Sequence, residues 1–164
     1  MKADLSAYIS FEGRAREALE HYRTALGGKV LIETFRTWGI PNAPGHEDDV
    51  VYGVLRTDDG FVLRVKDLPF DEQPISQGSA WALCLNGEEA ERLTTCWNGL
   101  TVGATIIEPL KTTPWGDLNG VLIDPFGVTW VVNRRLGMRG RGGITRIPPR
   151  RRAVPPSPAA RGGS

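Results

Sequence analysis

GVLRTDDG (residues 53–60) recurs 67 positions later as GVLIDPFG (residues 120–127). Both copies run Gly-Val-Leu, one further residue, an acid-bearing turn and a closing Gly. A turn of this composition between two apolar runs predicts a β-hairpin, in which Gly60 and Gly127 take the positive φ that glycine tolerates. The repeated phrase therefore predicts two similar hairpins, and it suggests that the duplication extends beyond them.

The stretches before the hairpins repeat as well. FEGRAREALEHY (residues 11–22) aligns with LNGEEAERLTTC (residues 85–96), and in each copy a strand ends, a Gly-containing turn follows and a helix begins. A β-rich run follows each helix, at residues 29–35 and 104–110. The helices are predicted from apolar residues spaced three or four positions apart: Ala15, Ala18, Leu19, Tyr22, Ala25 and Leu26 in the first copy, and Ala90, Leu93, Trp97 and Leu100 in the second.

Each half of the chain thus reads strand–helix–strand–strand–strand. The sequence predicts an α+β fold of two tandem βαβββ modules, at about residues 4–67 and 78–133. One half alone covers its sheet poorly. We therefore expect the two modules to form a curved eight-stranded mixed sheet with the helices on its outer face.

The charge of the chain is divided unevenly. The net charge is +1, but all 19 acidic residues lie at or before Asp124. Residues 1–133 hold 11 basic groups against those 19 acids, whereas residues 134–164 hold nine Arg, six Gly, five Pro and no acid. Like-charge repulsion and a shortage of apolar groups predict a disordered tail over residues 134–164, so the paired domain is assigned to residues 1–133.

Composition limits the class of protein. The first residues carry charges where a signal peptide needs an apolar stretch, and no apolar run approaches the ~18 residues that span a bilayer. Two cysteines, Cys84 and Cys96, are too few for a disulfide framework and suit a reducing compartment. We expect a soluble, cytoplasmic protein with no membrane partner.

Three segments carry a resemblance to a known family: YISFEGRAREALEHYRTALGG (8–28), DDVVYGVLRTDDGFVL (48–63) and PLKTTPWGDLNGVLIDPFGVTWVVN (109–133). In this order they resemble the vicinal oxygen chelate superfamily of glyoxalases, bleomycin-resistance proteins and extradiol dioxygenases, and above all its PhnB-like branch. The resemblance implies a cup formed by the two modules, a divalent metal on its concave side, and a homodimer. The metal ligands of the family come from the first and last strands of each module.

Strand alternation predicts which residues face the cup. In the first strand Ser6, Tyr8 and Ser10 face it, and in the fifth Ala80, Ala82 and Cys84 do, with Trp81, Leu83 and Leu85 turned toward the helix. The family's ligand positions then map to Ser6 (or Ala7, if the alignment slips by one), Arg64, Ala80 and Val131. None of these is a usual ligand for Zn, Ni, Mn or Fe. PhnB-like relatives commonly carry His where this chain has Tyr52. We therefore predict no metal and no other cofactor, with a divalent metal as the alternative.

Three other residues offer metal or thiol chemistry. His21 is predicted to be a half-exposed helix residue rather than a ligand. His46 lies beside Glu47, Asp48 and Asp49, where a surface metal contact competes with simple solvation. Cys84 faces the predicted cup, and a small buried thiol is favoured over a nucleophile because no His or Lys is placed to lower its pKa.

The remaining cup-facing residues describe a small-molecule pocket with apolar and aromatic walls and a few polar groups. Arg64 would hold a carboxylate or phosphate of the ligand, or alternatively pair with an acid such as Asp117. Trp115 would stack on the ligand or pack at the rim. The ligand-binding candidates are Tyr8, Ser10, Tyr52, Arg64, Cys84, Trp115, Asp117, Val131 and Asn133.

Three functions follow for testing. The first is a metal-independent binding protein that holds a small organic ligand in the cup. The second is a metal-dependent lyase, isomerase or dioxygenase of the glyoxalase type. The third is weak nucleic-acid association through the Arg-rich tail, which would be sensitive to salt. The sequence favours the first and assigns no catalytic residue.

Overall fold

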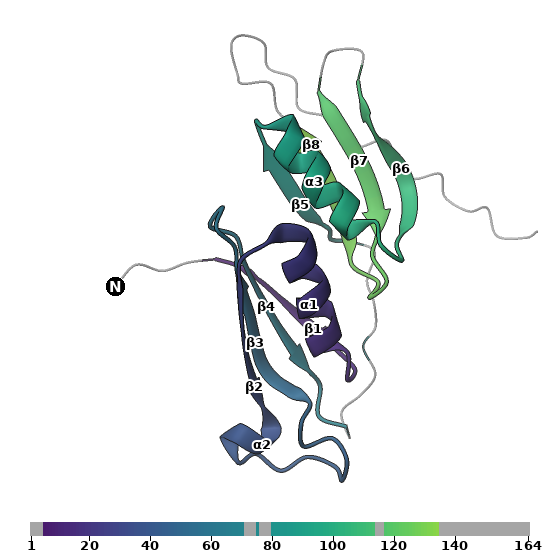
Figure 1. Ribbon diagram of the computed structural model, residues 1–164. Helices are drawn as coiled ribbons and strands as arrows, with labels where there is room; N and C mark the ends of the chain where they lie inside the picture. The colour runs from purple at the N-terminus through teal and green to yellow at the C-terminus, as the bar shows by residue number, and fades with distance from the viewer. Residues whose placement is uncertain (1–4, 71–74, 76–79, 114–116, 135–164) are drawn as a thin grey trace, which may run out of the picture.

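A computed structural model describes residues 5–70, 75, 80–113 and 117–134 (Figure 1). The predicted pocket residue Trp115 and residues 135–164 of the predicted tail lie outside the described residues. The first module comprises β1 (Ala7–Phe11), α1 (Ala15–Leu26), β2 (Lys29–Thr34), α2 (Phe35–Trp38), β3 (Val50–Arg56) and β4 (Val62–Asp67). The second comprises β5 (Leu83–Gly87), α3 (Ala90–Leu100), β6 (Thr105–Thr112), β7 (Leu118–Ile123) and β8 (Thr129–Arg134). The two predicted βαβββ modules are confirmed.

The strands of the two modules have the same topology. The first sheet, which we call sheet A, runs β1-β4-β3-β2, and sheet B runs β5-β8-β7-β6. In each sheet the first strand pairs in parallel with the last, and the other pairs are antiparallel. Both sheets are therefore mixed, as predicted.

The predicted single eight-stranded sheet is instead two four-stranded sheets in the described part of the chain. The modules join through their helices, since α1 and α3 pack against each other between the sheets (Figure 1). Small residues allow this approach, because Gly99 of α3 lies directly against Ala25 of α1. One buried core cluster runs through both modules, so the helices, rather than strand pairing, connect the halves.

The first glycine of the repeated phrase marks the place where a helix presses on its sheet. A Cβ at Gly53 would lie 2.5 Å from the Leu19 side chain of α1. A Cβ at Gly120 would lie 2.8 Å from the Trp97 ring of α3. Glycine is favoured at both points because a Cβ would force the neighbouring buried side chains to shift.

The last glycine of the phrase closes the hairpin, as predicted. Gly60 and Gly127 both have φ +87°, and each donates its backbone N–H to the residue three positions earlier, Thr57 or Asp124. Thr57 Oγ1 accepts the N–H of Phe61, and Asp124 Oδ1 accepts those of Phe126 and Val128. Asp124 thus caps backbone N–H groups of its own hairpin.

Asp124 also joins the two modules. Its Oδ2 accepts the hydroxyl of Tyr22 on α1 at 2.8 Å and the indole N–H of Trp130 at 3.0 Å. Tyr22 is fully buried and Asp124 is nearly so. Burial, and after it the nearby Asp124, raise the pKa of Tyr22 far above its ordinary value. Tyr22 therefore stays protonated and ties helix α1 to the second hairpin.

One local prediction needs correction, and two further local features were not predicted. Strand β5 begins only at Leu83, so Ala80 and Ala82 precede it, and Trp81 is 50% exposed instead of packing under the helix. Strand β8 extends one residue past the predicted domain boundary, and Arg134 donates to the Glu88 carbonyl. The short helix α2 was not predicted. None of the helices within the described residues has the length and apolar character needed to cross a membrane.

Candidate ligand-binding face

Helix α1 covers one side of sheet A, and we call the other side of this sheet its open face. Strand alternation and register define it, because directly paired residues share a face. Leu63, Val65 and Asp67 are buried toward α1, whereas Arg64 lies on the open face. Its register partners there are Tyr8 of β1 and Val54 of β3. The predicted orientation of β1 and β4 agrees with this pattern of burial. The open face of sheet A consists of Tyr8, Ser10, Lys29, Leu31, Glu33, Tyr52, Val54, Arg56, Val62, Arg64 and Lys66.

Arg64 lies at the centre of this face. Its guanidinium is partly buried and donates a hydrogen bond to Ser6 Oγ, just before β1. The contact holds a cation against Ser6, a position where the family resemblance implies a metal ligand. The alternative of an ion pair between Arg64 and Asp117 stays a prediction.

Aromatic rings gather beside Arg64. Tyr52 is half-buried, and its ring stacks on that of Trp38 from α2, with centroids 6.4 Å apart and planes 21° from parallel. Partial burial, and next the neighbouring Tyr52, raise the pKa of Tyr8. Tyr8 itself is 55% exposed. Two of the predicted pocket residues, Tyr8 and Tyr52, are thus brought together with Arg64.

The open face of sheet B carries the other predicted residues. Cys84 of β5 is the register partner of Val131 in β8. Asn133 lies between Asn86 and Asn119, its partners on either side, so three amide side chains form a row across the sheet. Cys84 is exposed and free, which corrects the expectation of a buried thiol: β5 is an edge strand and leaves this side chain uncovered.

Two further candidates occupy other surroundings. Ser10 is half-buried and is the register partner of Lys66. Asp117 begins the return from the loop before β7, where its N–H donates to Thr113 Oγ1 and its carbonyl accepts the N–H of Thr113. These contacts involve only backbone atoms of Asp117. The role of its side chain in the pocket stays a prediction.

The loop acids near His46 are engaged within the protein. His46 Nδ1 lies 2.9 Å from Asp49 Oδ2, and Asp48 pairs with Arg36 at 2.8 Å. Glu47 accepts the N–H of Gly45. Over the described ranges, no group of three or more His, Cys, Asp or Glu side chains is arranged to hold a metal ion.

His21 packs with aromatic rings on the helix side of the molecule. Its ring lies 5.6 Å from Phe126 and 5.8 Å from Tyr22, measured between centroids. Its Nε2 atom is buried and has no hydrogen-bond partner among the described residues. It is distant from the open faces, as predicted.

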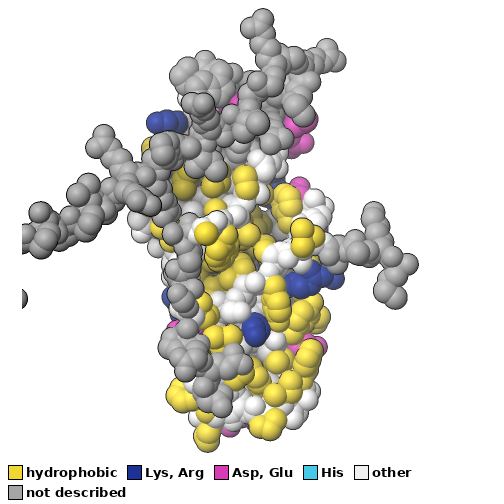
Figure 2. All heavy atoms as spheres, turned by 180° about the vertical axis from the view of Figure 1, so that it is seen from behind, with side chains coloured by type: hydrophobic (Ala, Val, Ile, Leu, Met, Phe, Trp, Pro, Cys, Tyr) yellow, Lys and Arg dark blue, Asp and Glu magenta, His cyan; other side chains and the backbone are white. Residues whose placement is uncertain are grey.

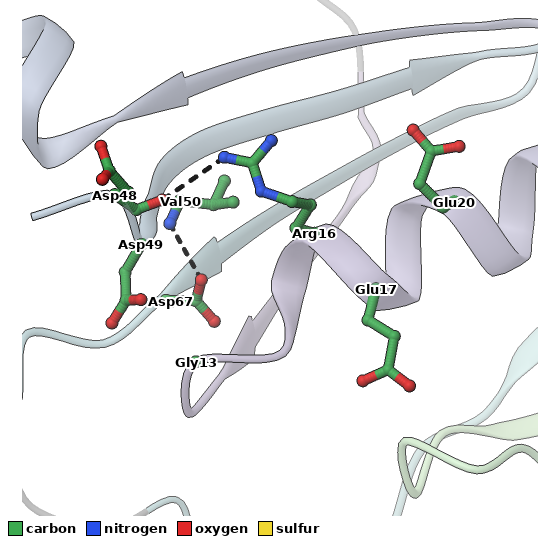
Figure 3. A pocket seen from close by; sticks show the side chains of 8 residues that line it. All are labelled: Gly13, Arg16, Glu17, Glu20, Asp48, Asp49, Val50 and Asp67. Atoms are coloured by element: carbon green, nitrogen blue, oxygen red, sulfur yellow. Dashed lines mark hydrogen bonds between the residues drawn. The ribbon is translucent and has the colours of Figure 1, made fainter. Parts of the chain in front are cut away.

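A cavity of about 390 Å³ lies elsewhere, at the start of α1. Figure 3 shows the Asp67 carboxylate beside Val50 and the Arg16 guanidinium reaching the loop at Asp48. Asp67 accepts the N–H of Ala15 and that of Val50, each at 2.9 Å. Its pKa is raised by burial, against the effect of these N–H groups. The carboxylate inside the cavity is therefore already used to hold α1 and β3, and the open faces remain the better candidate for a ligand.

No protein-family model matches the chain. Among solved structures, PA1353 from Pseudomonas aeruginosa is 25% identical with a TM-score of 0.69, covering 82% of this chain and 98% of its own. A PhnB protein and putative 3-demethylubiquinone-9 3-methyltransferase from Bacillus cereus is 24% identical with a TM-score of 0.64, covering 81% of this chain and all of its own.

A third solved structure is the glyoxylase/bleomycin resistance protein/dioxygenase domain from Frankia sp. EAN1pec. Its TM-score is 0.60 at 12% identity, and the match covers 84% of this chain and 95% of that domain. This chain has the vicinal oxygen chelate fold. Protein YjdN from Escherichia coli strain K12 is 23% identical over 137 residues, which are 79% of this chain and 93% of YjdN.

The vicinal oxygen chelate fold implies a divalent metal. Such a metal would need suitable ligands at the positions of Ser6, Arg64, Ala80 and Val131. Ser6 and Arg64 hydrogen-bond to each other, Val131 is apolar, and Ala80 lies outside β5. The register places Tyr8 beside Arg64 and Cys84 beside Val131, which adds a single thiol to the set. A guanidinium repels a divalent cation, and one thiol does not form a site that needs three or four protein ligands. These residues do not fit the metal of the vicinal oxygen chelate fold.

Sequence reasoning missed several residues of the two open faces. Asn86 and Asn119 follow from the same alternation that identified Arg64 and Asn133, so a complete count along each strand would have found them. Trp38 could not be found in this way, because its contact with Tyr52 depends on the short helix α2.

Proposed function

We propose that this protein is a PhnB-like member of the vicinal oxygen chelate superfamily that binds a small organic molecule on its open faces without a metal ion. The fold supports the superfamily, and the likeness to the Bacillus cereus PhnB protein supports the branch. The observation that carries the proposal is the chemistry at the paired positions Tyr8–Arg64 and Cys84–Val131. They offer a guanidinium, a phenol, a single thiol and an apolar side chain, whereas a metalloenzyme needs three or four ligands such as carboxylates and imidazoles.

The same groups suit ligand binding. Arg64 presents a planar fork of N–H donors for an acidic group of the ligand. Tyr8 and Tyr52 add aromatic surface with a polar tip, and the Asn86, Asn119 and Asn133 side chains offer both donors and acceptors. Few directed polar groups among aromatic and apolar side chains are typical of a small-molecule site.

The test is a ligand screen by thermal shift, because a compound that binds the folded state raises its unfolding midpoint. We expect at least one class of small organic molecules to bind the wild type. Replacement of Arg64 with Met should weaken the binding of that compound about tenfold or more. It should lower the midpoint of the free protein by only a few degrees. A large loss of stability with unaltered ligand affinity would show that Arg64 is structural.

We also propose that the protein is a homodimer, as the resemblance to its superfamily implies. Multi-angle light scattering that returns the mass of one chain would contradict it.

A further inference from the structure

The open face of sheet A has a charge opposite to that of its domain. Residues 1–133 hold 11 basic and 19 acidic groups. The open face reverses this balance, with one acid, Glu33, against four basic residues. The basic residues are Lys29, Arg56, Arg64 and Lys66. Seen from behind in Figure 2, the lower module shows Lys and Arg among hydrophobic side chains, with acids toward its edges.

Three of these four cations are not paired with a described acid. Lys29, Arg56 and Lys66 form no ion pair with another described residue. The carboxylate of Glu33 accepts the hydroxyl of Thr37 on α2 at 3.0 Å. Like charges gathered on one face repel one another, and an anion bound among them relieves that repulsion.

Aromatic and apolar surface adjoins the cations. Tyr8 is the register partner of Arg64 and is 55% exposed. The stacked pair of Tyr52 and Trp38 lies on the other side, and 54% of Trp38 is exposed. Val54, the register partner of Arg64 on β3, is a buried apolar residue beside them. A ring placed here would stack on exposed aromatic groups with its acid within reach of Arg64.

Sheet B shows that this chemistry does not come from the fold alone. By the offset of the repeated phrase, Arg64 corresponds to Val131 and Lys66 to Asn133. Val54 corresponds to Val121, which is also apolar. The backbone is duplicated, yet these two positions carry positive charge in the first module only. On the open face of sheet B one cation, Lys111, is matched by one acid, Glu108. The excess of positive charge is therefore specific to the open face of sheet A.

Resting on the binding function proposed above, we propose that the open face of sheet A binds an oxyanion carried on a planar aromatic body. Arg64 and Lys66 hold the oxyanion, while Tyr8, Tyr52 and Trp38 contact the ring. Arginine binds carboxylate and phosphate through paired hydrogen bonds, and aromatic rings stack in offset or edge-on arrangements.

The test uses one aromatic body with four charges: naphthoate, naphthyl phosphate, naphthalenemethanol and naphthylmethylammonium. Their affinities are measured by calorimetric titration of the full chain. We expect one of the two anions to bind at least about tenfold more tightly than the alcohol, with the ammonium weakest. The ratio of naphthoate to naphthyl phosphate distinguishes a carboxylate ligand from a phosphate ligand.

Matched variants locate the binding. Lys66→Met and Trp38→Leu should each weaken the anion about tenfold. Lys66→Met should leave the alcohol unaffected, and Trp38→Leu should weaken the alcohol in the same proportion as the anion. Arg23→Met is the control, because Arg23 lies on α1 in an exposed pair with Glu20. It should change no affinity.

The outcomes separate this inference from the function on which it rests. Equal affinity for alcohol and anion, or equal losses in Arg23→Met and Lys66→Met, would overturn the inference and leave a binding protein. If none of the four naphthalene compounds binds while other compounds bind in the screen, the inference is also overturned and the binding function remains. Failure of both the series and the screen would overturn the proposed function itself.

Discussion

Asp124 has a local role in its own hairpin and a second role with Tyr22, which lies 102 positions earlier in the sequence. Its Oδ1 accepts two backbone N–H groups of its own hairpin, and its Oδ2 accepts Tyr22 and Trp130. The local role was predictable, because an acid at the start of a DPFG turn commonly caps nearby N–H groups. The contact with Tyr22 was not predictable, since it depends on how the two modules pack.

Tyr22→Phe tests this contact at the scale of one residue. The loss of one hydrogen bond to a carboxylate, with the other three kept, should lower the free energy of unfolding by about 1–2 kcal/mol at neutral pH. Folding raises the pKa of Tyr22 above the ordinary value of 10.0. The contribution of Tyr22 to stability is therefore complete below pH 10 and is lost as the pH rises above it, where only the unfolded chain ionises.

Urea unfolding of wild type and Tyr22→Phe at a series of alkaline pH values measures this difference. The stability gap between the two proteins should be constant below pH 10 and narrow above it. A gap that stays constant through the alkaline range would mean that the Tyr22 hydroxyl is not held as the structure places it.

At the scale of elements, features set by local residue spacing could be predicted, and features set by tertiary contacts could not. The stripe at Ala15, Ala18 and Leu19 predicted α1 because helix periodicity is local. Alternation failed at Trp81, because it applies only within a strand and β5 begins two residues later. Helix α2 has four residues, held by a reciprocal cap between Thr34 and Thr37, and is too short to show a periodicity. The separation into two sheets escaped prediction because it depends on contact between helices.

Gly99→Ala tests that helix contact. A Cβ at this position would lie 2.5 Å from Ala25 Cα and 2.7 Å from Ala25 Cβ, so α3 must move away from α1. The cost of overpacking, about 1–3 kcal/mol, should outweigh the gain of about 1 kcal/mol in helix propensity. We expect a net loss of stability in thermal or urea unfolding.

Thr94→Ala on the exposed side of α3 is the matched control, and its stability should change by less than about 1 kcal/mol. If Gly99→Ala proves as stable as this control, the helices do not meet at Ala25 and Gly99.

At the scale of the whole molecule, a duplicated fold carries different chemistry in its two halves. Sheet A presents Arg64 and Lys66 with aromatic neighbours, and sheet B presents a row of Asn side chains beside Cys84. The fold and the direction of Arg64 could be predicted because both follow from pattern and pleat. The pairing of Tyr52 with Trp38 and the exposure of Cys84 could not, since they depend on tertiary packing.

The account depends on open faces that bind organic molecules and not divalent ions. Metal retention tests this most directly: chelator-treated protein is dialysed against Zn²⁺, Ni²⁺, Mn²⁺ or Fe²⁺, and bound metal per chain is measured by mass spectrometry. We predict retention well below one ion per chain for each metal, unchanged by Cys84→Ser. One ion retained per chain by the wild type, and lost in Cys84→Ser, would contradict the account.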